Sequence, residues 1–204
     1  DGNTLMMGHI GTLAVNPALH RDLPFDTVSS FEPVVLAAVV PNVLVVNPAS
    51  PVRTMADFVA WLRREPGRVT YASTGVGQST HLSPVWMLQM LNAQAIHVPF
   101  RGSAPAQTEL LSNHVGFLVD NLTGVIEQVR AGRLRALAVT SAERNAQLPD
   151  VPTMRESVPE LAEYEVNTWF GLFAPTASPA TVVARLSGAL PRILAEPDFA
   201  ARLS

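Results

Sequence analysis

One segment constrains the fold more than any other: an apolar strand runs into a turn rich in glycine and hydroxyl groups, and an amphipathic helix follows directly. The turn contains Gly75 and Gly77, and the helix is expected over 81–91. The unpaired N–H groups of the first helical turn and the positive end of the helix dipole point into such a turn. A carboxylate or phosphate can therefore bind there without a lysine. Ser79 or Thr80 is expected to cap the helix.

The two glycines admit three interpretations. A dinucleotide fingerprint needs a third glycine where Thr80 stands, and an acidic residue about 20 positions further on, which the sequence lacks. Alternatively, the glycines only permit the tight geometry of a strand-to-helix turn. A site for a small anion is the interpretation that we favour.

Composition excludes several classes of protein. With 204 residues, of which 48% are hydrophobic, the chain is long enough for one large or two small domains with a real core. Its 14 basic residues are all arginine and mostly scattered, and the formal charge is −3, so no basic stripe for nucleic acid is expected. The absence of cysteine excludes disulfides, thiolate catalysis and zinc–cysteine sites.

The longest apolar run, residues 34–46, is too short to cross a bilayer, which needs about 20 residues. Because Pro41 and Asn42 interrupt it, we expect a buried pair of strands or a strand–turn–strand. No direct membrane insertion is expected. The start at Asp1 reads as a turn before a strand already under way, so the absence of a targeting signal is uninformative here.

Short strand-like runs alternate with amphipathic segments along the chain, which predicts an α/β protein built from βαβ units. Continuously apolar strands favour a sheet covered on both faces. Strands are expected at 4–7, 34–39, 43–46, 69–72, 96–99, 115–119 and 134–139. Helices are expected at 54–64, 81–91, 104–112, 124–131 and 181–194.

Three of these strands end in small polar residues that lead into a helix. These residues are 73–80, 100–103 and 120–123, and a fourth turn of the same kind is 9–12. In a parallel sheet such turns lie at one edge, outside the carboxyl ends of the strands, where ligands bind in open α/β sheets. We therefore expect helix N-termini from these turns to converge on one anionic group.

The polar turns belong to an ordered series of motifs that covers nearly the whole chain. The series comprises DG at 1–2, TL at 4–5, GT at 11–12, NPAL at 16–19, PNVLVVNP at 41–48, STGVG at 73–77, HL at 81–82, HVPFRGSAPA at 97–106, DN at 120–121, AG at 131–132, LRALAVT at 134–140, LPDVPT at 148–153 and WFGLFAP at 169–175. It resembles the substrate-binding proteins of tripartite tricarboxylate transporters, the Bug family of bacterial periplasmic receptors.

The resemblance implies a two-domain periplasmic binding protein of type 2-like fold, which hinges at two crossovers and closes on a small carboxylate. Domain I would hold 1–37 and 168–204, and domain II would hold 38–167. The crossovers would be 34–46 and 164–173. Family members begin with a signal peptide and a further βα unit, and they continue past Ser204, so the chain is expected to lack these parts.

The resemblance also implies partners and a binding site. The partners would be a small carboxylate and the membrane subunits of a tripartite transporter, the location would be the periplasm, and no cofactor is expected. The implied ligand-binding residues are Gly11, Thr12, Asn42, Ser73, Thr74, Gly75, Gly77, Ser79, His81, Phe100, Arg101, Gly102, Ser103, Asp120, Asn121 and Trp169. Phe100 and Arg101 stand where the family commonly has tyrosine and lysine, and both departures bear on ligand preference.

Several of these residues invite other roles. His81 lacks an adjacent nucleophile and orienting acid, so we expect it to brace the glycine turn by a hydrogen bond rather than to act as a base. Asp120 more often organises its turn, or binds an amino group of a solute, than catalyses. Trp169 is a core residue or a wall of the cleft, and Arg101 pairs with a ligand carboxylate or with a surface acid.

The remaining histidines, His9, His20, His97 and His114, show no metal-ligand spacing, so no metal site is expected. The leading hypothesis is a non-enzymatic periplasmic receptor for a di- or tricarboxylate, an acidic amino acid or an aromatic acid. The alternative is the effector-sensing domain of a transcription regulator with the same fold. An α/β enzyme that uses His81 is the third and weakest reading.

Overall fold

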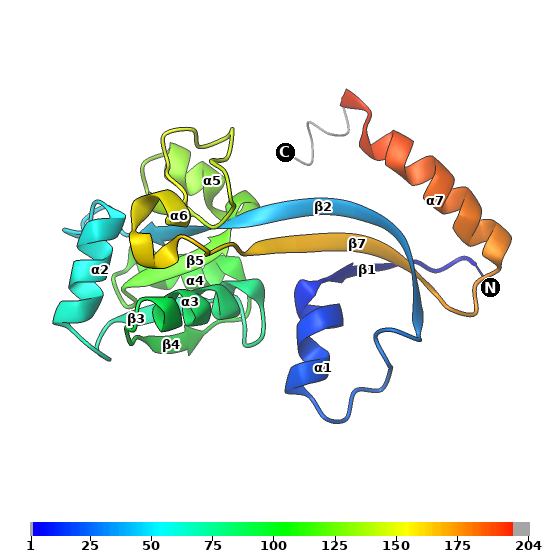
Figure 1. Ribbon diagram of the computed structural model, residues 1–204, viewed down its shortest axis with the longest axis horizontal. Coiled ribbons are helices and arrows are strands. Elements are labelled where there is room, and N and C mark those ends of the chain that lie inside the picture. The colour runs from blue at the N-terminus through cyan, green and yellow to red at the C-terminus, as the bar shows by residue number, and fades with distance from the viewer. Residues whose placement is uncertain (1, 198–204) are drawn as a thin grey trace. The chain divides into compact units, whose positions relative to one another are not determined.

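The computed structural model describes residues 2–197, and the chain divides into two compact units. Unit 1 comprises Asp1–Val39 and Thr168–Ser204, and unit 2 comprises Val40–Asn167. The chain passes between the units twice, within strand β2 (Phe31–Val46) and at the start of strand β7 (Asn167–Pro175) (Figure 1). Each unit is described below by itself.

Unit 2 contains a mixed sheet in which parallel and antiparallel pairs meet at β5 (Phe117–Asn121). Strand β3 (Thr70–Ser73) runs parallel to β4 (Ile96–Pro99) and to β5, whereas β2 runs antiparallel to β5 and to β6 (Arg135–Val139). The helices of this unit are α2 (Met55–Arg64), α3 (Ser79–Met90), α4 (Ser103–Leu111), α5 (Leu122–Arg130), the short α6 (Met154–Ser157) and a 3₁₀ turn at Pro159–Leu161. The alternation expected from the sequence is therefore present.

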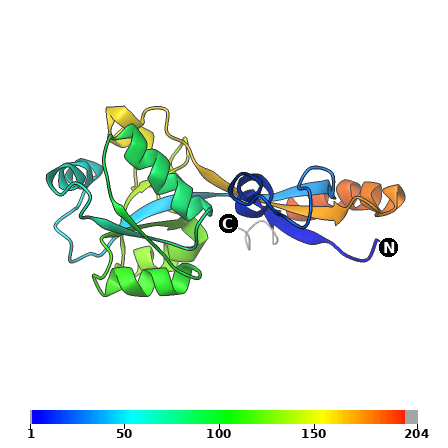
Figure 2. The same ribbon diagram turned by 90° about the horizontal axis from the view of Figure 1, so that it is seen from below.

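Helices cover both faces of the sheet in unit 2 (Figure 2). Phe58 of α2, Met87 of α3 and Phe117 of β5 belong to one core cluster, and these three side chains are fully buried. Leu110 of α4 and Val125 of α5 are equally buried outside that cluster. Each such side chain contributes about 1.5–3 kcal/mol of transfer free energy, so the core fixes the strands whose ends carry the polar turns.

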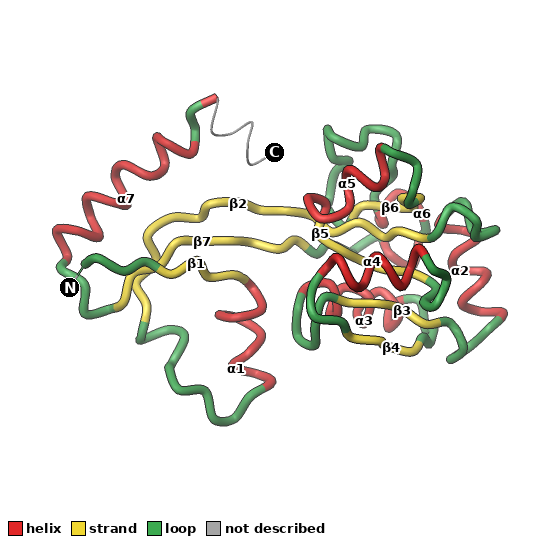
Figure 3. The backbone as a smooth tube through the Cα atoms, turned by 180° about the vertical axis from the view of Figure 1, so that it is seen from behind, coloured by secondary structure: helices red, strands yellow, loops and turns green. Residues whose placement is uncertain are grey.

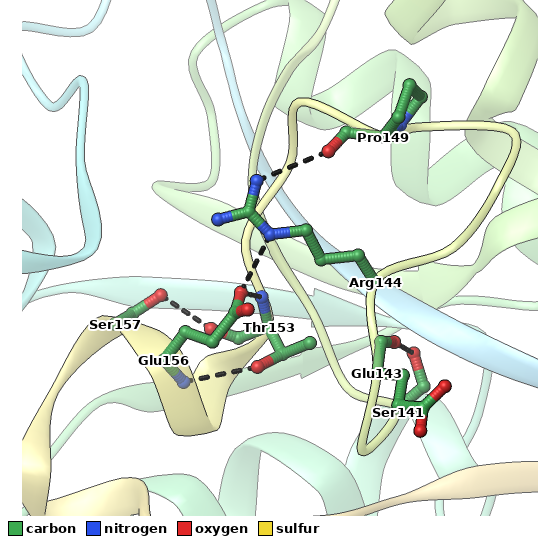
Figure 4. A network of polar contacts seen from close by, with 7 residues as sticks. All are labelled: Ser141, Glu143, Arg144, Pro149, Thr153, Glu156 and Ser157. Atoms are coloured by element: carbon green, nitrogen blue, oxygen red, sulfur yellow. Dashed lines mark hydrogen bonds and ion pairs between the residues drawn. The ribbon is translucent and has the colours of Figure 1, made fainter.

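The N-termini of α2 and α6 are closed by capping boxes. The Thr54 hydroxyl accepts a hydrogen bond from the N–H of Asp57, and the Asp57 carboxylate accepts one from the N–H of Thr54. Thr153 and Glu156 form the same reciprocal pair of hydrogen bonds at α6. Nε of Arg144 also donates to the Glu156 carboxylate at 2.9 Å (Figure 4). Both helices therefore satisfy their first N–H groups with their own side chains.

Unit 1 contains β1 (Met6–His9) antiparallel to β7, a π-helical turn (Gly11–Val15), α1 (Asn16–Leu19) and α7 (Ala180–Leu194) (Figure 3). The helix α7 starts at Ala180, with Pro179 as its N-cap residue. No helix among residues 2–197 is long and apolar enough to cross a membrane.

The expectation of a turn at Pro41 and Asn42 is wrong, because β2 is one strand of 16 residues. The pairing of β2 with β5 begins at Asn42, so the proline stands just outside that ladder and its missing N–H costs it no bond. Asn42 is fully buried, and its N–H donates to the Thr140 hydroxyl at 2.7 Å. The N–H of Thr140, the residue after β6, donates in turn to the carbonyl of Asn42 at 2.9 Å, so the backbone of Asn42 is bonded within the sheet.

Candidate functional site

Three polar turns lie at one edge of the unit 2 sheet, because β3, β4 and β5 are parallel and their carboxyl ends point the same way. The turns after β3 and β4 are also bonded to each other. The N–H of Phe100 donates to the carbonyl of Ser73 at 3.0 Å, and the N–H of Gly102 donates to that of Thr74 at 3.3 Å. The structure thus brings together the candidate residues from 73 to 103.

Several amides of the turn after β3 already have protein partners. The Thr74 N–H donates to the Thr80 hydroxyl at 3.0 Å, and the Gly77 N–H donates to Nδ1 of His81 at 3.2 Å. His81 therefore makes the bracing hydrogen bond that the sequence predicts. The prediction that Ser79 or Thr80 caps α3 is wrong, because the N-cap is Gln78 and the hydroxyl of Thr80 turns back to Thr74.

The N-termini of α3 and α4 receive no capping bond from the side chain of their N-cap residue, in contrast to α2 and α6. At α4 the N-cap is Gly102, whose φ of +107° suits glycine and which has no side chain to offer. Gly75, with φ of +145°, allows the turn before α3 in the same way. Helix α5, which begins after Asn121 at the end of β5, likewise has no capping bond from the side chain of its N-cap residue. Three helices thus begin at one sheet edge without a side-chain cap.

A buried carboxylate organises the turn after β5. Asp120 is 1% exposed; one carboxylate oxygen accepts the Ser103 hydroxyl and the other accepts the N–H of Asn121 at 2.8 Å. The side-chain amide nitrogen of Gln107 donates to the Ser103 hydroxyl at 2.7 Å and to the carbonyl of Gly124 at 2.8 Å. Burial raises the pKa of Asp120 against the effect of these bonds. Asp120 and Ser103 thus hold α4 against β5, and the sequence reasoning missed Gln107.

Sequence reasoning also missed His97. Its ring stacks on Tyr71, its cross-strand neighbour, and on His81, with centroid distances of 4.9 and 4.1 Å. Its Nε2 lies 2.6 Å from the hydroxyl of Ser73, as in a nucleophile–base pair, but Ser73 is fully buried and no substrate can reach it in this conformation. Burial, together with the charge of His81, lowers the pKa of His97 to about 4.

The other candidates of unit 2 differ in accessibility. Asn42 pairs with Asn121 across β2 and β5, which places both at the edge where the three turns meet. Phe100 is half-buried and Arg101 is exposed in the turn after β4. Of the pair, Arg101 is therefore the side chain that reaches solvent. Across residues 2–197, no three His, Cys, Asp or Glu residues are grouped so that they could hold a metal ion.

Gly11, Thr12 and Trp169 belong to unit 1 and are not part of the edge formed by β3, β4 and β5. The expectation of four polar turns at one sheet edge is thus met by three, because the fourth follows β1, which pairs with β7. In that turn His9 accepts the N–H of Gly11 at 3.1 Å through Nδ1, and its Nε2 lies 2.8 Å from the Thr12 hydroxyl. Trp169 lies half-buried in β7.

Comparison with known proteins identifies relatives along the whole chain. The family described as tripartite tricarboxylate transporter family receptor matches residues 1–204. A "UPF0065 protein in tcbD-tcbE intergenic region" of Pseudomonas sp. (strain P51) is 39% identical over 97% of this chain and 58% of its own length. The protein BugT of Bordetella pertussis is 32% identical over 92% of this chain and 57% of its own length. The chain thus spans less than two thirds of these relatives.

Solved structures give the same result. The structure "R. palustris Rpa4515 with adipate" matches with a TM-score of 0.93 and 32% identity, and the match covers 100% of this chain and 67% of the solved chain. "MatC (Rpa3494) from Rhodopseudomonas palustris with bound malate" has a TM-score of 0.86 and 31% identity, with 100% and 68% covered. Both confirm the α/β fold of periplasmic binding proteins. By sequence and by structure, the chain belongs to the tripartite tricarboxylate transporter receptor family, a family of receptors and not of enzymes.

Proposed function

We propose that the protein is a non-enzymatic solute receptor that binds a small dicarboxylate in the periplasm and serves the membrane subunits of a tripartite transporter. The two units would act as the domains predicted above, 1–37 with 168–204 and 38–167. The observation that carries the proposal is that α3 and α4 both begin without a side-chain cap at the carboxyl edge of the parallel strands.

The chemistry of this edge suits a carboxylate. Each helix N-terminus carries roughly half a positive charge and presents N–H donors, which together favour an anion without a lysine or arginine. The hydrogen bonds between the turns after β3 and β4 hold the two N-termini together, so one ligand group can use both. The relatives named with adipate and malate support a dicarboxylate as the ligand.

The test is calorimetric titration of the 204-residue chain with adipate and with malate, beside a matched pair of glycine variants. Gly102 and Gly132 both have positive φ, and an added Cβ would meet nothing within 4 Å at either. Gly102→Val strains the N-terminus of α4, whereas Gly132→Val strains the turn after α5. The two variants therefore impose a similar backbone cost, but only the first lies at the proposed site.

We expect saturable binding of at least one of the two acids, a loss of at least fivefold in affinity for Gly102→Val, and unchanged affinity for Gly132→Val. The loss reflects a displaced donor worth about 1–3 kcal/mol. Equal affinities in the two variants would place the anion elsewhere. No heat from either acid with the folded wild-type chain would contradict a dicarboxylate receptor.

A further inference from the structure

We propose that His81 and His97 act as a stacked pair of positioning residues, which holds the turn after β3 at both ends and thereby sets the geometry of the α3 N-terminus. For its consequence on ligand affinity, this inference rests on the proposed function. The hydrogen bonds of the pair can be tested without any ligand.

The contacts place one ring at each end of the turn. Nε2 of His97 lies 2.6 Å from the hydroxyl of Ser73, the last residue of β3. Nδ1 of His81 accepts the N–H of Gly77, two residues before α3 begins, at 3.2 Å. The two rings stack with an interplanar angle of 19°. His97 comes from β4 and His81 from α3. Their stacking therefore links the two ends of the turn through side chains.

The two braces differ in what they require of the imidazole. The Gly77 amide can only donate, so Nδ1 of His81 must carry a lone pair, and the proton of the neutral ring sits on Nε2. An imidazolium has no lone pair, so protonation of His81 ends this brace. The hydroxyl of Ser73 can donate or accept, so the contact with His97 tolerates either form of that ring.

The surroundings keep the pair neutral. Burial lowers the pKa of His81 and, with the charge of His81 as a second cause, lowers that of His97 to about 4. Tyr71 of β3 stacks on His97, and burial raises its pKa to about 12, so it stays a neutral phenol. Arg101, the charged residue in the turn after β4, is exposed to solvent. Because the pKa values of His81 and His97 are both lowered from 6.5, both rings are neutral at neutral pH and both hydrogen bonds are intact.

A purely structural role predicts something different. The stack continues through Tyr71 to Phe117, with a centroid distance of 5.3 Å, so the rings could serve only as packing. Packing needs the volume of the ring, whereas positioning needs an acceptor for Gly77. His81→Leu keeps much of the volume without the acceptor, and His81→Gln keeps an acceptor oxygen without the titration. His114, which is exposed and paired with Glu109, provides the control variant His114→Gln.

The experiment is NMR spectroscopy of the 204-residue chain between pH 7.5 and 4, following the histidine tautomers and the Gly77 amide, with adipate and malate titrations at pH 7. We expect His81 in its Nε2–H form and a Gly77 amide shift that titrates with His81. His81→Gln should abolish that titration, and His114→Gln should not. His81→Leu should weaken binding at least fivefold, and His81→Gln should restore part of it.

The Nδ1–H tautomer of His81 at pH 7, or a Gly77 amide indifferent to its titration, overturns the brace. Wild-type affinity in a folded His81→Leu overturns the positioning role. A Gly77 amide that follows His81, in a chain that binds neither acid, supports the brace and contradicts only the proposed function.

Discussion

The helix N-termini of unit 2 fall into two groups. Helices α2 and α6 close theirs with capping boxes from Thr54 and Thr153. By contrast, α3, α4 and α5 begin after Gln78, Gly102 and Asn121 without a capping bond from that residue's side chain. A good cap is worth about 1 kcal/mol, so the protein forgoes this stabilisation at the three helices that begin at the carboxyl edge of β3, β4 and β5. We therefore expect the backbone donors at the starts of α3 and α4 to serve ligand binding.

Adding a side-chain cap to α3 should make this helix resemble α2 and α6, and we expect it to change ligand affinity more than any other substitution proposed for this chain. Gln78 has φ of −75° and ψ of 162°, the extended geometry of a good N-cap, so Gln78→Asp can cap without strain. We expect a stability gain of about 0.5–1 kcal/mol and at least a tenfold loss in affinity for adipate or malate, because the new carboxylate occupies the donors and repels the ligand. Urea unfolding and calorimetry measure the two effects.

Gln78→Ser is the matched control, since it caps without adding a charge and should lose less affinity than Gln78→Asp. If Gln78→Asp binds as tightly as the wild-type chain, the N-terminus of α3 is not the anchor.

Removing a cap from α2 should have the opposite pattern. Thr54→Ala deprives the Asp57 N–H of its acceptor, and we expect a loss of about 1 kcal/mol in the free energy of unfolding. Affinity for the two acids should stay as in the wild-type chain, because α2 begins away from the three turns. Weaker binding by this variant would mean that general loss of stability, and not the site, governs affinity.

The smallest effect concerns the buried acid that fixes the start of α4. The pKa of Asp120 is raised by burial from its ordinary value of 3.8, so its contribution to stability is present below that value and is lost as pH rises through the folded-state pKa. Asp120→Asn does not titrate. Its stability relative to the wild-type chain should therefore improve by a few tenths of a kcal/mol or more between pH 4 and 7 in urea unfolding.

His81 has the opposite sign. Because burial lowers the pKa of His81, its contribution to stability is present above the ordinary value of 6.5 and is lost as pH falls through the folded-state pKa.

For Asp120, the contradicting outcome is a stability of Asp120→Asn, relative to the wild-type chain, that falls between pH 4 and 7. That result would contradict the argument that burial raises the pKa of the carboxylate.

The polar turns could be predicted from the sequence because their composition is local. Gly75 and Gly102 both have positive φ, as glycines in such turns often do, and both precede a helix as expected. The partners of the side chains could not be predicted, because they depend on register. His97 meets Tyr71 only because β3 and β4 pair in parallel at that position. Likewise, the Thr80 hydroxyl could cap a helix, but in this fold it accepts a hydrogen bond from the N–H of Thr74 instead.

The central claim is that the N-termini of α3 and α4, which lack a side-chain cap, bind the carboxylate. Amide chemical shifts of the wild-type chain, recorded while adipate or malate is added at pH 7, test it most directly. We predict saturable shifts concentrated at 74–81 and 100–104, with the capped N-termini at 54–57 and 153–156 unaffected. Saturable shifts centred elsewhere, or none in the folded chain, would contradict the claim.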